Sequence, residues 1–433
     1  MRHLAILIPL LLLSSPARAF DLSLKECREM ALHSDENLKI AENNLTGADL
    51  DRAIARTAYL PNLSGTANLF YSAPDSKLGD VMTMQMRGAY MAGISLTQPI
   101  YAGGKITSAN RMAAVGRQIS QEQLRAARMD VLADAEKSYW TYVAVLAKVD
   151  MMESYLTMMD SIYEMTDFSV RTGMAPRQAL LRVDTRRSEI IYRLRQARAG
   201  ADVCRMALCR VIGVPDTTSV TPTETFGNVP GLPKNDAGVE GRPETMILEK
   251  AIDIKKHEVT MARADFLPTV GVQLGWSAYG NIKMKGWMQD ETGNYMPYSS
   301  NFHSNGFLGV LSVQVPIFHW GEGMKKVKRA KIEVENARLS LARNKRLMEL
   351  EASQNFSNLL TGTTLIKSAE TAMTEADENL RIMKEQYEAG LSTLTDLLEA
   401  QSQWQTSFAN AIEAQTQYRI YYVDYMRSIG ALE

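Results

Sequence analysis

The chain has 433 residues, enough for one large core or for two or three ordinary domains, and its formal net charge is −1. This balance gives no sign of the basic surface that nucleic-acid binding requires, so no nucleic-acid partner is expected. Three cysteines are too few for a disulfide scaffold, and a hydrophobic content of 45% is ordinary for a globular protein.

The first 19 residues have the pattern of a secretory signal peptide. Arg2 gives a positive charge, the run 4–13 is apolar, and Ala-Arg-Ala at 17–19 is a small-x-small site, so cleavage before Phe20 is expected. The apolar run is too short to cross a bilayer, and no later apolar stretch reaches that length. The exported protein is therefore either soluble outside the cytoplasm or crosses a membrane as a β-barrel.

Two short strands are expected next, in the segments 62–71 and 89–98. In the first segment apolar residues alternate with polar ones, as in a strand with one apolar face, and the second segment alternates less clearly. Each segment has about ten residues, which is the length of a tilted transmembrane strand. Pro61 precedes the first strand and Pro99 follows the second.

A long stretch without proline comes after these strands. No proline occurs between Pro99 and Pro176, so residues 104–172 can form one helix, about 100 Å long at about 1.5 Å per residue. Gly173 then predicts a turn, and Pro176 fits the first turn of a second long helix, where proline is tolerated. We therefore expect two long helices joined by a glycine turn.

The same order of elements returns in the second half of the chain. The sequence RTAYLPNLSGTAN at 56–68 is similar to RADFLPTVGVQLG at 263–275 and aligns Pro61 with Pro268. Three further matches share a shift of 217 positions, and they align Pro99 with Pro316, Gly173 with Gly390, and Ile212-Gly213 with Ile429-Gly430. Such a constant shift indicates an internal repeat.

This shift divides the chain into a first repeat at 20–213, a linker at 214–239 and a second repeat at 240–433. The two shifts differ by ten residues (207 between Pro61 and Pro268, 217 afterwards), so the second repeat has an insertion between its two prolines. We place this insertion in a loop between two strands.

The second repeat predicts strands at 269–279 and 307–315, separated by a loop at 280–305 that is rich in glycine, polar and aromatic residues. The chain then offers four strands, which are too few to close a barrel. Open sheet edges are not tolerated in lipid, so several chains would have to share one barrel.

The last helix carries large side chains at a spacing of seven residues, which is typical of coiled-coil packing. The first seam of this pattern contains Leu397, Trp404, Ala411, Tyr418 and Tyr425, and the second contains Phe408, Tyr422 and Ile429. Gln401 and Gln415 fall on the second seam and weaken it.

Four stretches of the sequence resemble a known family, the TolC-like outer-membrane efflux proteins. They are ARTAYLPNLSG, ARADFLPTVGV, LTQPIYAGGK and EQYEAGLSTLTDLLEAQ, and the last is the most specific. The resemblance covers nearly the whole mature chain. It implies an α+β membrane protein, a homotrimer in which four strands per chain form a twelve-stranded transmembrane β-barrel in outer-membrane lipid. Long helices would continue this barrel as a coiled-coil tube across the periplasm.

The resemblance also assigns positions to the prolines and glycines of the repeat. Pro61 and Pro268 would mark where the chain enters the barrel, and Pro99 and Pro316 would mark where it leaves. The glycine turns at Gly173 and Gly390 would form the periplasmic tip. In the family, Asp residues six positions after such glycines surround the pore, and ion pairs there hold it closed. The aperture residues that this implies are Asp396, Glu399, Tyr387, Gln178 and Arg177.

The first repeat departs from the family pattern at this tip. It has Ala179 where the second repeat has Asp396, so an acidic residue is missing from half of the expected ring. Arg171, Arg177 and Arg182 flank this position and could pair with Asp396 or Glu399. An exposed helix face with charges of no consequence is the alternative.

By resemblance, the chain is a passive export duct in the outer membrane of a Gram-negative bacterium. A periplasmic adaptor (a membrane fusion protein) and an inner-membrane transporter of the RND or ABC type would complete the machine and expel drugs or other toxic small molecules. A channel for type I protein secretion is the first alternative. A soluble, secreted coiled-coil scaffold is the second.

Neither an enzyme nor a cofactor site is expected. HEVTM at 257–261 lacks the second His of a metalloprotease helix, and GGKI at 103–106 lacks the spacing of a phosphate loop. The 25 methionines, with VMTMQM at 81–86 and a second group between 151 and 159, raise the possibility of a path for soft metals. Adaptable packing is the favoured explanation for them.

Overall fold

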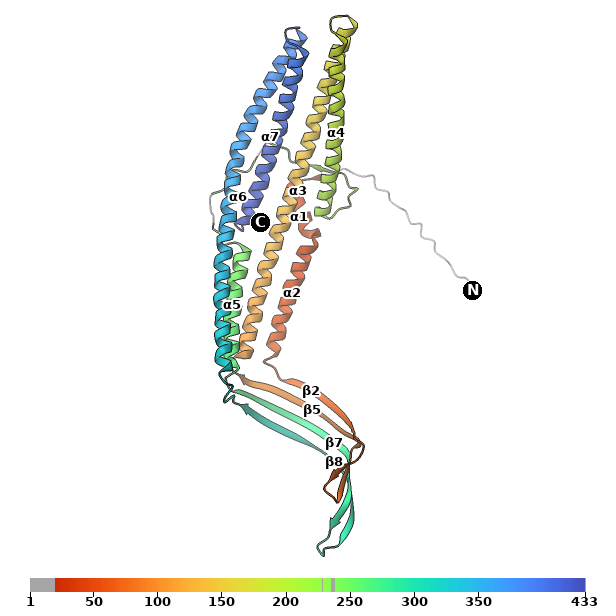
Figure 1. Cartoon of the computed structure of the whole chain (residues 1–433), viewed down its shortest axis with the longest axis vertical. Helices are drawn as coiled ribbons and strands as arrows, with labels where there is room; N and C mark the ends of the chain where they lie inside the picture. The colour runs from red at the N-terminus through yellow and green to blue at the C-terminus, as the bar shows by residue number, and fades with distance from the viewer. Residues whose placement is uncertain (1–19, 228, 235–237, 433) are drawn as a thin grey trace, which may run out of the picture. The chain divides into compact units, whose positions relative to one another are not determined.

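The structure is a computed structural model that describes residues 20–227, 229–234 and 238–432. The expected signal peptide at 1–19 lies outside these residues. In chain order (Figure 1) the elements are β1 Phe20–Leu22, α1 Leu24–Ser34, α2 Glu36–Thr57, β2 Asn62–Tyr71, β3 Ser76–Leu78, β4 Met82–Gln85, β5 Arg87–Ala102, α3 Lys105–Arg171, α4 Arg177–Ile212, β6 Val220–Pro222, α5 Pro243–Ala264, β7 Thr269–Gln289, β8 Tyr295–Gln314, α6 Glu322–Glu388 and α7 Leu394–Ser428.

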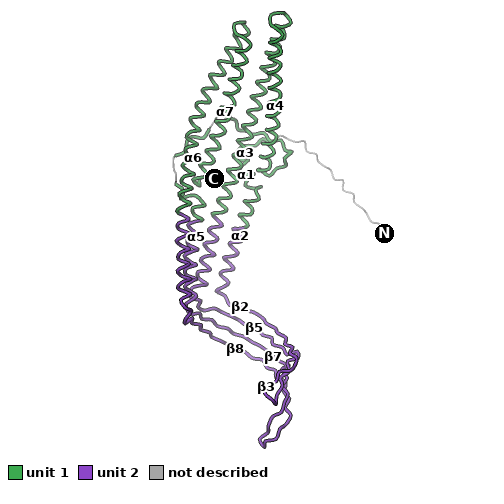
Figure 2. The backbone as a smooth tube through the Cα atoms, in the orientation of Figure 1, with its two compact units in different colours: residues 1–43, 122–247, 342–433 green, residues 44–121, 248–341 purple. Residues whose placement is uncertain are grey.

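The chain divides into two compact units (Figure 2). Unit 1 comprises 1–43, 122–247 and 342–433, and unit 2 comprises 44–121 and 248–341. Among the helices that the structure describes, none is both long enough and apolar enough to cross a membrane.

Unit 2 contains an antiparallel sheet built on four long strands. β2 pairs with β5, β5 with β7, and β7 with β8 (Figure 1). The short strands β3 and β4 extend the sheet, because β4 pairs with the later part of β7 and β3 pairs with β4. The four strands expected from the alternating segments are therefore confirmed, and two short strands join them.

The prediction of a loop at 280–305 is wrong for most of these residues. β7 continues to Gln289 and β8 begins at Tyr295, and the two pair along this extension. Two glycines that suggest a loop are instead places of close strand contact. A Cβ at Gly280 would lie 2.7 Å from the Tyr90 hydroxyl, and one at Gly286 would clash with the backbone carbonyl oxygen of Val81. Glycine is required at 286 because the neighbouring backbone leaves no space for a side chain, whereas at 280 it gives space to the Tyr90 ring.

Only the residues between the two strands form a turn, and Asp290 organises it. Its Oδ1 accepts hydrogen bonds from the backbone N–H groups of Thr292 and Asn294 at 2.9 and 2.8 Å. The segment between Pro268 and Pro316, which is ten residues longer than that between Pro61 and Pro99, therefore forms a long hairpin that closes through a short Asx-type turn.

Pro99 does not end its strand. β5 continues through it to Ala102, and the glycines that follow precede α3. The missing N–H of Pro99 is tolerated because the pairing of β5 with β2 ends at Thr97, and because the pairing with β7 shifts register between Pro99 and Tyr101. The other three prolines lie next to strand ends as expected, with Pro61 before β2, Pro268 before β7 and Pro316 after β8.

The long helices are confirmed, and their lengths match between the two halves. α3 and α6 have 67 residues each, and both bounds shift by 217 positions (105 to 322 and 171 to 388). α4 and α7 begin at 177 and 394, with the same shift. This agreement supports the two-repeat interpretation, which stays a prediction.

The core of unit 1 lies between these four helices. One buried cluster joins Tyr155 and Met159 of α3, Ile190 of α4, Leu380 of α6 and Leu397 of α7. All five residues of the first α7 seam are buried, which confirms the coiled-coil interpretation of that helix. Several methionines of α3, including Met159, are part of this core, as the packing explanation predicts.

The segment expected to be a plain linker, 214–239, contains a structural element. β6 lies within it and pairs in parallel with β1 at the start of the described chain. Val220 of β6 is buried in a cluster with Leu22 and Tyr139, and Tyr142 donates a hydrogen bond to the Val220 carbonyl oxygen at 3.0 Å. A pairing between segments 200 residues apart leaves no local pattern that could have predicted it.

Candidate functional site

The two turns of unit 1, after α3 and after α6, lie at the same end of the unit (Figure 1). Gly173 and Gly390 have φ angles of 74° and 73°, the left-handed region in which glycine is preferred. Each N–H bonds back to a carbonyl of its helix, Gly173 to Val170 and Gly390 to Tyr387. The next N–H bonds one residue further back, as in a Schellman motif. The two turns are thus the same structure made twice.

The helices that leave these turns begin differently. Thr393 is the N-cap of α7, and its hydroxyl accepts a hydrogen bond from the N–H of Asp396 at 3.3 Å. The Asp396 carboxylate in turn accepts from the N–H and hydroxyl of Thr393 at 3.0 and 2.7 Å, which completes a capping box. α4 has Pro176 and Ala179 at the matching positions, and its N-cap makes no side-chain hydrogen bond.

Asp396 is exposed, and its charge is stabilised locally. Hydrogen bonds from the Thr393 hydroxyl and N–H lower the pKa of the carboxyl group, so Asp396 is ionised at neutral pH. Both bonds use Oδ2, and Oδ1 has no partner among the contacts that the structure describes. Sequence reasoning missed this capping function, although the sequence TLTD at 393–396 could have shown it.

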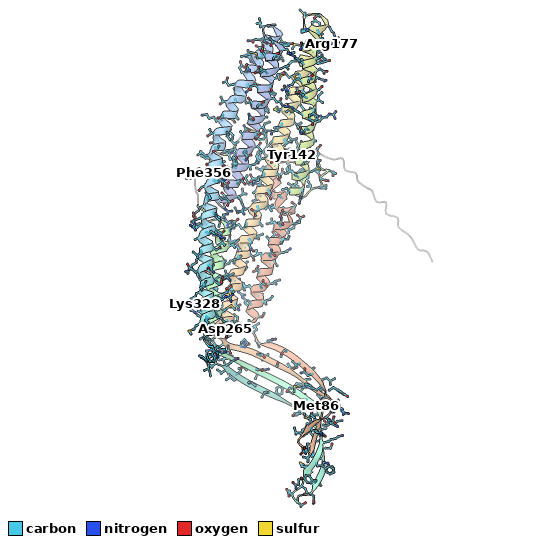
Figure 3. The ribbon with its side chains drawn as sticks, in the orientation of Figure 1. Met86, Tyr142, Arg177, Asp265, Lys328 and Phe356 are labelled. Atoms are coloured by element: carbon cyan, nitrogen blue, oxygen red, sulfur yellow. The ribbon has the colours of Figure 1, made fainter. Side chains whose placement is uncertain are left out.

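The other candidate residues lie around the same two turns. Figure 3 labels Arg177 at the turn end of α4, where Arg177 and Gln178 are exposed. Glu399 is exposed one turn beyond Asp396, and the half-buried Tyr387 lies within 3.4 Å of the Thr166 hydroxyl on α3.

The arginine pairs that the sequence leaves open do not occur among the described residues of one chain. Arg171 pairs with Asp167 of its own helix at 2.7 Å. In the described part of the chain, no ion pair joins Arg177 or Arg182 to Asp396 or Glu399. Arg182 and Gln178 instead lie along a shallow groove that also contains Leu398 of α7. The candidate residues of one chain therefore lie around the two turns, and no described ion pair joins them to one another.

Polar side chains tie the helices together behind the turns. Trp404 donates to Asp377 at 3.0 Å, which joins α7 to α6, and Arg186 donates to the Tyr155 hydroxyl at 3.3 Å, which joins α4 to α3. Tyr155 and Trp404 also pack ring against ring, with centroids 6.2 Å apart. The two hairpins therefore carry their turns on a shared aromatic core.

The sheet of unit 2 has one apolar and one polar face. The cross-strand register brings Ile94, Trp276 and Phe307 into one row across three strands. The next row on the same face contains Leu63, Leu96 and Leu274. On the opposite face, Ser64 and Ser95 share a hydrogen bond at 2.9 Å, and Gln273 pairs with Thr97. The sequence shows the alternation of apolar and polar residues within single strands. The pairing register aligns the apolar residues of neighbouring strands into one continuous band on one face of the sheet.

The apolar band is exposed to an unusual degree. Phe307 is 89% exposed and Leu69 is 77% exposed. The strands β2 and β8 have one partner each among the described strands, so the outer edge of each carries unpaired backbone groups. A single chain thus presents a sheet that is open at both edges and apolar on one uncovered face.

A matching turn lies between each of two helices, α2 and α5, and the proline that precedes the next long strand. After α2, the N–H groups of Tyr59 and Leu60 bond to Arg56 and Thr57, and after α5 those of Phe266 and Leu267 bond to Arg263 and Ala264. Lys105, the first residue of α3, also forms an ion pair at 3.3 Å with Asp265, which follows the end of α5. Figure 3 labels Asp265 at this junction in unit 2.

A family model described as "outer membrane efflux protein" matches residues 27–205 and 240–431. The chain belongs to the outer membrane efflux protein family. It is therefore an export protein of the outer membrane, and the alternative of a soluble scaffold is wrong. The family is one of transport ducts, not of enzymes.

Two curated relatives are similar to this efflux protein over most of its length. It is 24% identical over 399 residues to the alkaline protease secretion protein AprF of Pseudomonas aeruginosa, covering 88% of this chain and 79% of the relative. It is 23% identical over 428 residues to the outer membrane protein OprJ of the same species, covering 95% and 84%.

Solved structures share the fold of this efflux protein over nearly its whole length. CusC, described in a study of folding and transmembrane channel formation, has a TM-score of 0.77 at 14% identity and covers 95% of this chain and 94% of its own. The Campylobacter jejuni outer membrane channel CmeC has a TM-score of 0.75 at 19% identity and covers 95% and 86%.

Proposed function

We propose that three copies of this chain form one passive export duct. Each copy would give its four long strands to a twelve-stranded barrel, with the free edge of β2 in one copy pairing with the free edge of β8 in the next. The observation that carries this proposal is the sheet of unit 2, which leaves both edges unpaired and an apolar face uncovered. Closure would satisfy the edges, and lipid would cover the apolar face.

The helices of the three copies would continue this barrel as a tube through the periplasm. The turns at Gly173 and Gly390 would form its tip, where a periplasmic adaptor and an inner-membrane transporter of the RND or ABC type would dock and supply the energy. The duct itself would catalyse no reaction and hold no cofactor. The turn at Asp290–Asn294 would lie at the opposite side of the membrane, because longer hairpins of such barrels face the cell exterior.

At the tip, Asp396, Glu399, Tyr387, Gln178 and Arg177 would surround the aperture. Three copies of the Asp396 carboxylate around one axis would repel one another unless cations or arginines neutralised them. The cap uses only one oxygen of each carboxylate, which leaves Oδ1 for a cation or for Arg177 of a neighbouring copy. Capping and cation binding are therefore compatible uses of the same side chain.

Channel recordings in planar bilayers test this function. Wild-type protein should give discrete conductance steps that divalent or trivalent cations block from the tip side, and Asp396→Ala should weaken that block. Glu413→Ala, an exposed carboxylate elsewhere on α7, is the matched control and should leave the block unchanged. Absence of any conductance would overturn the duct, whereas an unchanged block in Asp396→Ala would overturn only the acidic ring.

Small toxic molecules are the proposed cargo, and proteins are the second candidate because one relative is a protease secretion protein. Deletion of the gene in its own bacterium separates the two. Increased sensitivity to dyes and antibiotics, restored by the plasmid-borne gene, would support small-molecule export. Loss of a secreted protein without any change in sensitivity would support protein secretion.

A further inference from the structure

A cavity of about 540 Å³ interrupts the contact between α3 and α7 in unit 1. The two helices touch on either side of it. At one side the Arg419 guanidinium lies 3.5 Å from the centre of the Trp140 ring, and at the other the Gln405 amide lies 3.7 Å from the sulfur of Met152. Between these contacts the helices leave a space in the size range of small-molecule sites.

The walls of this cavity are mostly apolar and come from four parts of unit 1. They are Val143, Leu146, Ala147 and Asp150 of α3, Phe408, Ala411, Ile412 and Gln415 of α7, Met373 of α6, and the segment formed by β6 and the residues after it, with Thr221, Pro222, Glu224, Thr225 and Phe226. This last segment covers the space, although the sequence predicts only a linker there.

The covering segment is fixed in place. Glu224 accepts hydrogen bonds from the Tyr139 hydroxyl and, at 3.0 Å, from the backbone N–H of Leu24. Burial opposes ionisation of Glu224, but the hydrogen bonds from Tyr139, Leu24 and Thr223 outweigh it and lower its pKa. The segment that covers the cavity is therefore held in place through the charged side chain of Glu224, which keeps the space between the helices open.

The polar groups of the cavity are mainly acceptors. Asp150 is an exposed carboxylate at its margin, and Glu224 is a second carboxylate. The Gln415 amide nitrogen donates to Glu370 at 3.1 Å, while its Oε1 is buried and has no hydrogen-bond partner among the described residues. No lysine or arginine is among the described residues that line the space. A buried acceptor without a donor is costly unless something supplies one.

We propose that this cavity binds an amphipathic organic cation. The apolar body of the ligand would lie between α3 and α7, its positive charge near Asp150, and a donor group would satisfy Gln415 Oε1. Arg419, which borders the cavity, lies against the Trp140 ring and near Glu224, so Asp150 is the carboxylate left for the ligand. An anion would meet this carboxylate and no lysine or arginine among the described lining residues, so it should bind more weakly than a cation. The site lies between helices of one chain, so it goes beyond the export passage and does not depend on the aperture residues.

Fluorescence titration of the purified full-length protein in mild detergent tests this site. Ethidium, an aromatic cation, should bind saturably with one site per chain, above the signal of detergent alone. The aromatic anion 8-anilino-1-naphthalenesulfonate should not compete for it. Ala147→Trp fills the cavity and should abolish ethidium binding, whereas Ala199→Trp, on the exposed face of α4, should not change it.

Two polar variants decide whether the cation and the donor are recognised. Asp150→Asn should weaken ethidium binding by about two- to fivefold, the range of an exposed ion pair. Gln415→Leu should also weaken it, because it removes the acceptor that the ligand would satisfy. The melting temperature should change little, because the lost hydrogen bond to Glu370 is offset by the removal of an unpaired buried oxygen.

Binding that is equal in wild type, Ala147→Trp and Gln415→Leu would overturn the proposal, and so would tighter binding of the anion. Gln415→Leu decides the matter if Ala147→Trp fails to fold. Channel conductance should be normal in all of these variants, so failure of the site and failure of the duct are distinguishable.

Discussion

The helical core of unit 1 and the sheet of unit 2 differ in the exposure of their large apolar residues. Leu397 of α7 is completely buried by other helices of its own chain, whereas Phe307 of β8 is 89% exposed. The core encloses its seam of aromatic and aliphatic residues, while the sheet places an equally ordered band where nothing in the chain covers it. Unit 1 can be read as a finished core, and unit 2 as one part of a larger assembly.

This difference limits what exposure in a single chain can indicate. For the enclosed seam of unit 1, burial within the single chain predicts the cost of changing a residue. In unit 2 we expect the face of the sheet to predict that cost, because lipid is proposed to cover one face and the export passage the other. The following variants separate the two rules.

Truncation in the core of unit 1 should have the largest effect. Leu397→Ala should lower the free energy of unfolding of the α6–α7 hairpin by about 2–5 kcal/mol, the range for a cavity left by a buried leucine. Leu391→Ala, at an exposed leucine of the neighbouring turn, is the control and should have little effect. Hydrogen exchange of the α7 amides measures both. Equal protection in the two variants would contradict the assignment of this core.

Two neighbouring residues of β8 test the rule for the sheet. Phe307 belongs to the apolar face, and Leu308, which pairs with Gly275, belongs to the other face, yet both are exposed in one chain. Phe307→Arg should destabilise the membrane-inserted form by about 2–4 kcal/mol, the cost of arginine on a lipid face at mid-depth. Leu308→Arg should be tolerated.

The amount of heat-resistant protein in the outer-membrane fraction reports this contrast, together with denaturant unfolding in detergent. Similar losses for both arginine variants would mean that the faces are not distinguished, and a greater loss for Leu308→Arg would reverse the proposed orientation of the sheet.

Much of the fold was predictable because its signals are local. The absence of proline between Pro99 and Pro176 permits one long helix, and Gly173 and Gly390 mark turns that need a positive φ. Alternation in 62–71 gave β2 with its observed bounds.

The features that were predicted wrongly or not at all depend on contacts between distant segments, which a local sequence pattern does not show. Gly280 and Gly286 favour a loop until the closeness of Tyr90 and Val81 explains them. Pro99 is tolerated inside β5 because pairing with β2 has already ended there. The pairing of β1 with β6 joins distant segments, and the sequence of neither short strand predicts which strand it pairs with.

The candidate tip was predicted in position but not in its local chemistry. The turns after α3 and α6 lie at one end of unit 1 (Figure 1), and Asp396 lies in the first turn of α7, next to the second of these turns. The hydrogen bonds of Asp396 with Thr393 give this residue a second reason to be present, and Pro176 and Ala179 explain why α4 lacks the same cap.

The caps give a smaller test, within unit 1. Thr393→Ala should destabilise the first turn of α7 by about 1 kcal/mol, which is typical for loss of an N-cap. The double variant Pro176→Thr with Ala179→Asp transfers the capping box to α4 and should protect the first turn of that helix. Amide exchange at 394–400 and 177–183 compares the two starts in one molecule. If Thr393→Ala leaves this ratio unchanged, the box contributes nothing to stability.

The smallest expected effect is the dependence of this cap on pH. The pKa of Asp396 is lowered by its bonds to Thr393, so its stabilisation is present above the unfolded value of about 3.9 and is lost as pH falls through the folded value. The protection of the α7 start relative to the α4 start should therefore fall below about pH 4. Asp396→Asn should abolish this dependence, and an unchanged pH profile in that variant would assign the titration to another group.

The central claim is that the sheet of unit 2 is completed by other copies of the chain. The most direct measurement is the mass of the purified protein in mild detergent, by native mass spectrometry or by light scattering corrected for bound detergent. We expect three chains per particle, with no stable smaller species once the protein is inserted into a membrane. A stable, membrane-inserted monomer would contradict it, because a single chain would then have to satisfy the edges of β2 and β8 alone.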